Sequence, residues 1–284
     1  GYLSLYYAGQ TFMAFQWDIL LLEVGFLAIF FAPNRFGDKS DPPHLMIWLY
    51  RLLVFKLMFS SGFVKLASGD ATWTSLSALD FHYFTQPLPN TIAWFAHQLP
   101  TWFQHGGVIG MFVIQLLLPF FIFAPRRLRH IAAFSFIFLE VIIAFTGNYT
   151  FFNILTIALI LLLFDDQFFN RAPARKPKLP SKSAMRGARI LTGFILILSV
   201  LSIPTSLRIV NSYGLFAVMT TTRQEIVIQG SDDGGLSWQN YEFKYKPGDV
   251  YDPPPFVAPH QPRLDWQMWF AALGTYERNP WFVN

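Results

Sequence analysis

Six ionisable side chains interrupt segments that are otherwise apolar, and they are the residues best placed to do chemistry in this chain. A charge at membrane depth costs roughly 2.5–3.5 kcal/mol on insertion scales, so each one needs a partner or a use. Three acids and three bases predict ion pairs between the segments, which would form a neutral network that sets helix register. The alternative is a polar cavity that holds a substrate or a proton-transfer site. The six residues are Asp18, Glu23, Arg51, Lys56, Lys65 and Glu140.

Lys65 is the candidate for the chemical alternative. It lies in residues 60–66, Ser-Ser-Gly-Phe-Val-Lys-Leu, where Gly62 permits another helix to approach closely. A lysine that is withdrawn from water can serve as a general base. We therefore name Lys65 as the candidate catalytic residue. The pairing network then consists of Asp18, Glu23, Arg51, Lys56 and Glu140.

Several kinds of site are not indicated by the sequence. The chain has no cysteine, which excludes disulfides, thiolate catalysis and Cys-ligated metals. Its six histidines never adopt a metal-ligand spacing, and no phosphate-binding Gly loop or nucleophile elbow occurs. We therefore expect no metal and no cofactor. Residues 208–284 hold six Lys/Arg against eight Asp/Glu, so a nucleic-acid partner is not expected either.

The composition is typical of a membrane protein. Apolar residues make up 53% of the chain and charged residues only 13%, about half the share in an average soluble domain. Phe alone occurs 32 times. One soluble core could not hide so much apolar surface, whereas a lipid bilayer accepts it as the exterior of the protein. We therefore expect a polytopic α-helical membrane protein.

Six segments approach the roughly 20 apolar residues that a membrane-spanning helix needs. The first two carry most of the ionisable groups, so soluble helices are the alternative for them. Trp17 and Trp48 lie near the ends of these two segments and favour spans. The six predicted spans are 12–32, 46–66, 107–124, 131–146, 151–169 and 189–207.

Basic residues occur in every second loop between these segments. They are confined to 33–45 (Arg35, Lys39), 125–130 (Arg126, Arg127, Arg129) and 165–189 (Arg171, Arg175, Lys176, Lys178, Lys182, Arg186, Arg189). Loop 67–106 and residues 147–150 hold none. Since basic loops are retained in the cytoplasm, 165–189 is predicted to be a cytoplasmic linker. Loop 67–106 and the tail that begins at residue 208 are then non-cytoplasmic.

Loop 67–106 is rich in aromatic residues, which suit a membrane–water interface. Residues 90–99 show helical spacing of apolar residues until Pro100, and we expect a short helix lying in the interface. Large apolar surfaces outside a membrane also mark interaction sites. The loop therefore supplies candidate residues for binding a client protein: Trp73, His82, Trp94 and Trp102.

The tail has a different pattern. Residues 224–230 are predicted to form a strand, and 241–246 alternate strictly between aromatic and charged residues, as a second strand would. Residues 231–238 fit the Asp-box pattern Ser-x-Asp-x-Gly-x-Ser-Trp, which predicts a hairpin turn. In that turn Gly supplies a positive φ, Asp233 accepts from backbone amides and Trp238 packs beneath. The tail is therefore expected to be a small β-rich domain outside the membrane.

Apolar residues recur with helical spacing over 266–273, after a Pro-rich stretch, and predict a short helix. This part of the tail supplies the remaining candidates for client binding. They are His260, Arg263, Asp265 and Trp266. The predicted domains are thus a transmembrane helical domain, 1–207, and a β-rich domain, 208–284. We expect the natural protein to extend beyond the N-terminal end of this sequence, because the chain does not begin with Met and shows no signal peptide.

Four stretches distributed over nearly the whole chain carry a resemblance to a known family. They are 20–28 (LLLEVGFLA), 146–153 (TGNYTFFN), 219–223 (MTTTR) and 259–269 (PHQPRLDWQMW). Together they resemble the lipase maturation factor family. The resemblance implies a membrane protein of the endoplasmic reticulum, or of the inner membrane in bacteria, that in animals assists the folding and dimer assembly of secreted lipases. Family members usually continue past the point that corresponds to Asn284, which implies a fragment. The absence of cysteine puts a redox role in doubt.

A second resemblance covers only residues 60–73. Gly62, Lys65 and Leu66 followed by Trp73 are similar to a membrane module of vitamin K-dependent carboxylases, in which the lysine serves as a base. Two hypotheses result. The first is a membrane-embedded folding or assembly factor whose non-cytoplasmic parts bind a secreted client. The alternative is a membrane enzyme with an outward-facing cavity that uses Lys65 as a base.

Overall fold

The computed structural model describes residues 1–32, 41–169, 180–200 and 206–282. Nearly all of its regular structure is helical. The elements in chain order are α1 (Tyr2–Ala8), η1 (Gln10–Met13), α2 (Gln16–Phe31), α3 (His44–Ala67), α4 (Ala71–Thr74), α5 (Ala78–Thr85), α6 (Thr91–His97), α7 (Thr101–Phe112), η2 (Val113–Leu117), η3 (Leu118–Phe123), α8 (Arg126–Thr146), α9 (Phe152–Ile160), η4 (Leu161–Leu163), α10 (Asp166–Phe169), α11 (Lys182–Val200), β1 (Gln229–Gly230), β2 (Gln239–Asn240), α12 (Arg263–Ala272), η5 (Tyr276–Arg278) and η6 (Pro280–Phe282).

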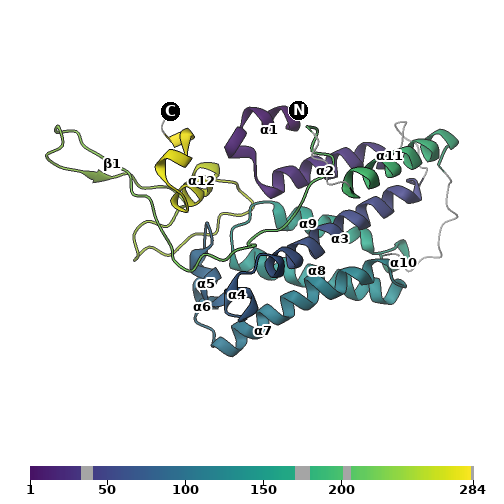
Figure 1. Ribbon diagram of the computed structural model, residues 1–284, viewed down its shortest axis with the longest axis horizontal. Coiled ribbons are helices and arrows are strands. Elements are labelled where there is room, and N and C mark those ends of the chain that lie inside the picture. Colours follow the sequence, from purple (N-terminus) through teal and green to yellow (C-terminus); the bar gives the residue numbers. More distant parts are fainter. Residues whose placement is uncertain (33–40, 170–179, 201–205, 283–284) are drawn as a thin grey trace.

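The long helices lie roughly side by side and form a bundle (Figure 1). The short helices α4, α5 and α6 gather at one end of the bundle, together with α12 and the hairpin. This end is called the tail end below. The opposite end holds α10 and the start of α8. Arg126 and Asp165 form an ion pair there, so the described part of the basic loop 125–130 lies at the end opposite the tail.

Helices occupy all six segments predicted to be spans, but they differ in length. Among the described residues, three helices are long and apolar enough to cross a membrane: His44–Ala67, Thr101–Phe123 and Arg126–Thr146. The helix α2 has 16 residues, and the apolar helix Phe152–Leu163 is shorter still. Six full-length spans are therefore not confirmed, although a helical membrane architecture is.

The second of these helices, Thr101–Phe123, changes its geometry partway along. It is α-helical to Phe112, opens into a π-helical turn over Val113–Leu117 and finishes as a 3₁₀ helix. Pro119 explains the change, because its ring has no N–H and would clash with the carbonyl of Gln115 in a regular α-helix. The wider turn puts Gln115 in contact with Lys65 of α3.

Gly62 allows α3 and this helix to approach each other, as the sequence predicted. A Cβ atom added at Gly62 would lie 2.9 Å from the Cβ of Gln115 and from a methyl group of Leu116. Such distances are too short for any larger residue without a shift of one helix. The close contact fixes where Lys65, one turn further along α3, lies against the π-helical turn.

The tail is not the β-rich domain that the sequence predicted. Among its described residues, paired strands are limited to Gln229–Gly230 and Gln239–Asn240. The amide of Tyr241 still donates to the carbonyl of Ile228, but residues 242–246 are not in a strand, and Lys246 is buried. Asp265 of α12 accepts hydrogen bonds from the amides of Tyr245 and Lys246. Contacts with α12 thus satisfy backbone groups that a sheet would otherwise pair.

The hairpin turn itself is as predicted. Asp233 accepts hydrogen bonds from the amides of Leu236 and Ser237, and Gly234 and Gly235 have positive φ angles of 72° and 91°. The hydroxyl group of Ser237, together with its amide and the hydroxyl group of Ser231, holds the pKa of Asp233 well below its usual value. Trp238 lies against the turn, with Cζ2 of its ring 3.7 Å from the position of a Cβ atom at Gly235, and it is also 60% exposed.

The helix predicted over 266–273 is α12, and its aromatic face packs into the bundle. Trp266 lies edge-to-face against Trp17 of α2, with ring centroids 4.8 Å apart. The indole nitrogen of Trp269 donates to the carbonyl of Thr85 at 2.8 Å. Both side chains are buried, so α12 is part of the hydrophobic core of the bundle.

The packing at Gly62 leads to a first prediction. Gly62→Ala should lower the free energy of unfolding by about 1–3 kcal/mol, because the added methyl group overpacks the contact between two membrane helices. Gly25→Ala is a matched control, since a Cβ atom at Gly25 meets no atom within 4 Å. Thermal unfolding of both variants in the same detergent measures the difference. Equal melting temperatures for the two variants would contradict the described packing.

Candidate functional site

A cavity of about 520 Å³ lies among α3, α5, α7, α8 and the start of α9. Its walls are mostly apolar, and residues 215–216 of the tail contribute to them. A few polar side chains face the same space. They are Ser61, Lys65, His82, Gln104, Gln115, Glu140, Thr146, Tyr149 and Asn153. Mostly apolar cavities with a few polar groups are the usual form of small-molecule sites.

Lys65 is the only lysine or arginine that lines this cavity in the described structure. Its side chain is 6% exposed, and its ammonium group donates to the carbonyl of Ser61 at 2.6 Å. A second contact, to Oε1 of Gln115, is long at 3.5 Å. The ammonium group also lies 5.3 Å from the centre of the Trp73 ring, a cation–π distance. No carboxylate of the described residues lies within ion-pair distance of it.

His82 and Tyr149 form a hydrogen-bonded chain beside Lys65. The hydroxyl group of Tyr149 donates to Oε1 of Gln86 at 2.9 Å and lies 3.2 Å from Nε2 of His82. Nε2 must then be the donor to Tyr149, which leaves Nδ1 of His82 without a proton. Burial, with the nearby charge of Lys65, lowers the pKa of His82 to about 4. His82 is therefore neutral at neutral pH.

Glu140 of α8 is buried at the same cavity and is paired differently from the prediction. Its Oε2 accepts a hydrogen bond from Nδ2 of Asn153 at 2.8 Å. Asn153 lies in α9, and α8 and α9 pack against each other. Glu140 thus takes a neutral amide as its partner in the described structure, and the predicted ion pair is not observed.

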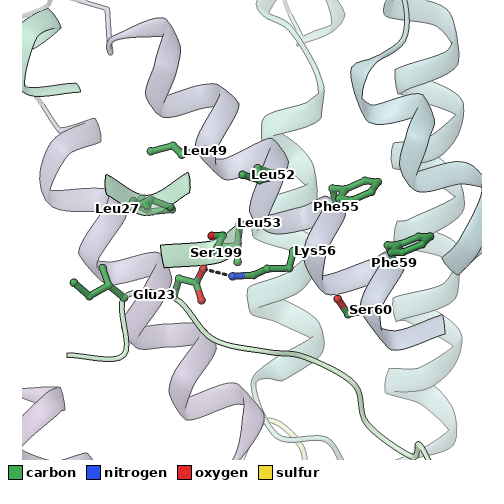
Figure 2. Close-up of a pocket in the computed structure, with 12 residues that line it drawn as sticks. Glu23, Leu27, Leu49, Leu52, Leu53, Phe55, Lys56, Phe59, Ser60 and Ser199 are labelled. Carbon is green, nitrogen blue, oxygen red and sulfur yellow. Dashed lines mark hydrogen bonds and ion pairs between the residues drawn. The ribbon is translucent and has the colours of Figure 1, made fainter. Parts of the chain in front are cut away.

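Glu23 and Lys56 form an ion pair between two of the predicted spans. Lys56 Nζ lies 2.7 Å from Glu23 Oε1, beside a cavity of about 150 Å³ (Figure 2). The other carboxylate oxygen of Glu23 accepts from the tail, namely from the amide and side chain of Asn211 and from the hydroxyl group of Tyr213. Both carboxylate oxygens of Glu23 are thus paired, and three of these four hydrogen bonds come from the tail.

Asp18 also finds its partner in the tail. The guanidinium group of Arg263 binds both carboxylate oxygens of Asp18, at 2.8 and 3.0 Å, and Tyr2 donates to the same carboxylate. Arg263 also donates to the carbonyl of Phe12. The prediction that Asp18 pairs with a base of another span is therefore wrong. Arg51 lies against the ring of Trp48, and no ion pair with Asp18 or Glu140 is observed.

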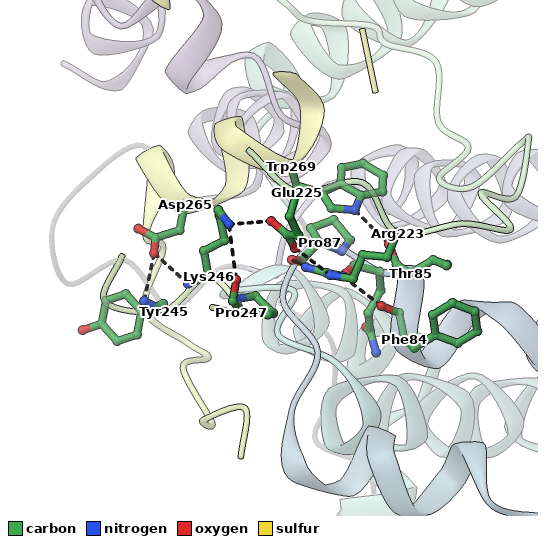
Figure 3. Close-up of polar contacts among 11 residues, drawn as sticks. Phe84, Thr85, Pro87, Arg223, Glu225, Tyr245, Lys246, Pro247, Asp265 and Trp269 are labelled. Atoms are coloured by element: carbon green, nitrogen blue, oxygen red, sulfur yellow. Dashed lines mark hydrogen bonds and ion pairs between the residues drawn. The ribbon is translucent and has the colours of Figure 1, made fainter. Parts of the chain in front are cut away.

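Arg223 is a further contact between the tail and the bundle. Its guanidinium group donates to the carbonyls of Phe84, Gln86 and Pro87 at the end of α5 (Figure 3). Its Nε donates to Glu225, which also pairs with the buried Lys246. Carbonyl groups near the end of a helix lose their intrahelical donors, and here the guanidinium group of Arg223 supplies donors to these three carbonyls.

The candidates for client binding differ in how far their side chains are exposed. Trp73, Asp265 and Trp266 are buried, and Arg263 is occupied by Asp18, so none of them presents a surface to a client. His82 lines the cavity. Trp94 and Trp102 are 57% and 74% exposed on α6 and α7. His260 is exposed and packs its ring against Tyr245.

Sequence reasoning missed the uncharged members of the site. Gln115, Tyr149 and Asn153 carry no charge and gave no periodic signal. The only available signal for Gln115 was its position four residues before Pro119. Asn148 was also missed, although it binds three carbonyls and two amides in residues 88–89 and 255–258.

Comparisons with known proteins point to one family. A family model described as the lipase maturation factor transmembrane domain matches residues 1–171, and one described as the lipase maturation factor C-terminal domain matches residues 209–284. Lipase maturation factor 2 of Mus musculus is 35% identical over the whole chain, and that of Homo sapiens is 34% identical. Lipase maturation factor 1 of Mus musculus is 34% identical. The chain covers 59%, 59% and 57% of these relatives. No solved structure gives a significant match.

The contacts of Arg223 lead to a second prediction. Arg223→Lys keeps the charge but cannot span three carbonyls, so it should lower the free energy of unfolding by about 1.5–3 kcal/mol. Proteolysis after α5 should become faster for the same reason. Arg278→Lys, at an exposed position of the tail, is the control. Unchanged stability and cleavage in Arg223→Lys would show that these hydrogen bonds do not hold the loop.

Proposed function

Because the chain belongs to the lipase maturation factor family, we propose that it is a membrane-embedded factor that assists the folding or assembly of exported client proteins, with secreted lipases as the first candidates. The observation that carries the proposal is the match of both family models, one to the helical part and one to the tail. The chain is an integral membrane protein, as its transmembrane family model and its apolar helices agree.

The proposed surface for client binding lies on α6 and the first turn of α7. Exposed aromatic side chains cluster there while the opposite faces of the two helices pack inward through Ala93, Ala96 and Gln104. Asn90 caps α6 and also donates to the carbonyl of Phe145, which fixes α6 against α8. A rigid platform that presents large apolar side chains suits the exposed apolar segments of an incompletely folded client. The exposed side chains are Ile92, Trp94, Phe95, Leu99, Trp102 and Phe103.

The tail end is proposed to be non-cytoplasmic, in the lumen of the endoplasmic reticulum or the bacterial periplasm. The described basic residues Arg126, Arg127 and Arg129 support this orientation, because they lie in α8 at the end away from the tail. Arg35, Lys39, Arg171, Arg175, Lys176 and Lys178, which also entered the prediction, lie outside the described residues. A folding factor for exported proteins needs its platform on that side.

The alternative of a membrane enzyme with Lys65 as a base is not supported by the comparisons. The relatives named above carry the name of a maturation factor and none that of a carboxylase. Lys65 does line a cavity, and its chemistry there is considered below.

A third prediction concerns the platform. The double substitution Trp94→Ser and Trp102→Ser should reduce photocrosslinking of a secreted lipase to the protein at least about fivefold, because large aromatic side chains dominate contact energies. The level of the protein in the membrane should not change, since both residues are exposed. Val250→Ser with Tyr251→Ser removes equally exposed apolar residues elsewhere in the tail and is the control. Equal crosslinking by both double variants would argue against the platform.

The orientation leads to a fourth prediction, for which the cysteine-free chain is well suited. In spheroplasts of a bacterial host, a membrane-impermeant maleimide should label Leu236→Cys at the exposed hairpin tip. Gln167→Cys, exposed in α10 at the other end, should react only after the membrane is permeabilised. The reverse pattern of labelling would overturn the proposed orientation.

A further inference from the structure

The cavity at Lys65 contains an ammonium group that forms no ion pair with a described carboxylate, since Glu140, on the same cavity, binds Asn153 instead. The ammonium group is withdrawn from water, and its two oxygen partners are the neutral groups of Ser61 and Gln115. His82, beside it, adds no charge of either sign. A buried charge without a counterion is costly in a membrane protein, so it marks a place where an anion would be stabilised.

The rest of the cavity is suited to a hydrocarbon chain. Apolar side chains from α3, α7 and α8 form most of its wall, and its volume of about 520 Å³ is within the range of sites for small organic ligands. Gly106 and Gly110 of α7 also face it, and an added Cβ atom at either glycine would meet no atom within 4 Å. The space beside α7 is thus open and not filled by neighbouring side chains.

The cavity also reaches the outer surface of the bundle. Phe103 of α7 and Phe138 of α8 both line it and are also 49% and 61% exposed. The cavity therefore opens between these two helices. A molecule dissolved in the bilayer could enter sideways, while a polar solute would first have to cross apolar surface.

From this arrangement we infer that the cavity binds a single-chain amphiphile with a singly charged anionic headgroup, of the long-chain fatty acid class. The headgroup is bound by the ammonium group of Lys65, and the chain lies among the apolar side chains toward the opening between α7 and α8. This inference does not rest on the proposed function, because it follows from the cavity alone.

The charges around the cavity favour a monoanion. Only one cation faces it in the described structure, and Glu140 faces it from α8. A doubly charged phosphate monoester would gain the same single ion pair with Lys65, and its second charge would be repelled by Glu140. A carboxylate headgroup matches the single ammonium group and can accept its charge-assisted hydrogen bond.

The test uses the purified chain in nanodiscs of zwitterionic lipid, with palmitate as the probe and hexadecanol as its uncharged analogue. Wild-type protein should bind palmitate at least about tenfold more tightly than hexadecanol, because only the carboxylate pairs with Lys65. Lys65→Met should abolish this preference, and Lys65→Arg should keep it. Vesicles that contain phosphatidic acid form a separate arm, and displacement of palmitate by that lipid would mean that a two-chain phospholipid is the occupant and would overturn the assignment.

A second variant keeps the test valid if Lys65→Met fails to fold. Gly110→Leu should fill the cavity and weaken both probes at least about tenfold, with normal expression, since leucine also favours the helix. Gly187→Leu, at a glycine of α11 with equally open space, is the matched control and should bind as wild type does. Equal binding of palmitate and hexadecanol by the wild-type protein, or palmitate binding that survives Gly110→Leu, would overturn the inference. Neither result bears on client binding, so the proposed function stands or fails separately.

Discussion

Two buried acids of α2 impose the constraint on which the rest of the structure depends. Asp18 and Glu23 lie in an apolar helix, where an unpaired carboxylate would be costly. Lys56 of the neighbouring helix α3 pairs with one of the two carboxylate oxygens of Glu23. The remaining acceptors are satisfied by residues of the tail, above all Arg263 and Tyr213. The bundle therefore depends on residues some 190 to 245 positions further along the chain.

This dependence explains why the tail is attached so firmly to the bundle. Residues 215–216 of the tail line the cavity at Lys65, and the carbonyl of Phe216 accepts a hydrogen bond from the indole nitrogen of Trp73. The middle part of the tail fixes the end of α5 through Arg223, and α12 fills the space above Trp17 with aromatic rings. The tail end of the bundle is thus built from both regions that the family models match, residues 1–171 and 209–284. Contacts between these two regions support the proposed platform on α6 and α7 and the cavity at Lys65.

The sequence predicted the parts of the fold that depend on local pattern. Apolar runs predicted a helix in each of the six segments, Gly62 predicted a close helix contact, and the Asp-box predicted the hairpin turn. Strand prediction over 241–246 failed because the amides of Tyr245 and Lys246 donate to the side chain of Asp265 in α12 and not to a neighbouring strand, which alternation in the sequence does not report. The partner of Asp18 could not be predicted, because an ion pair across 245 positions leaves no signal in spacing. Neutral members of the cavity, such as Gln115 and Asn153, carry no charge to attract attention.

The ion pair of Asp18 with Arg263 is the most direct test of this account. A double-mutant cycle with Asp18→Asn and Arg263→Met, unfolded by denaturant in detergent, measures the coupling energy between the two side chains. Each single substitution leaves a buried group unsatisfied, so we expect each to cost about 3 kcal/mol and the pair to cost clearly less than the sum. A coupling energy of about 2 kcal/mol or more would support a bundle that is completed by its tail. Additive effects, within about 0.5 kcal/mol, would contradict it.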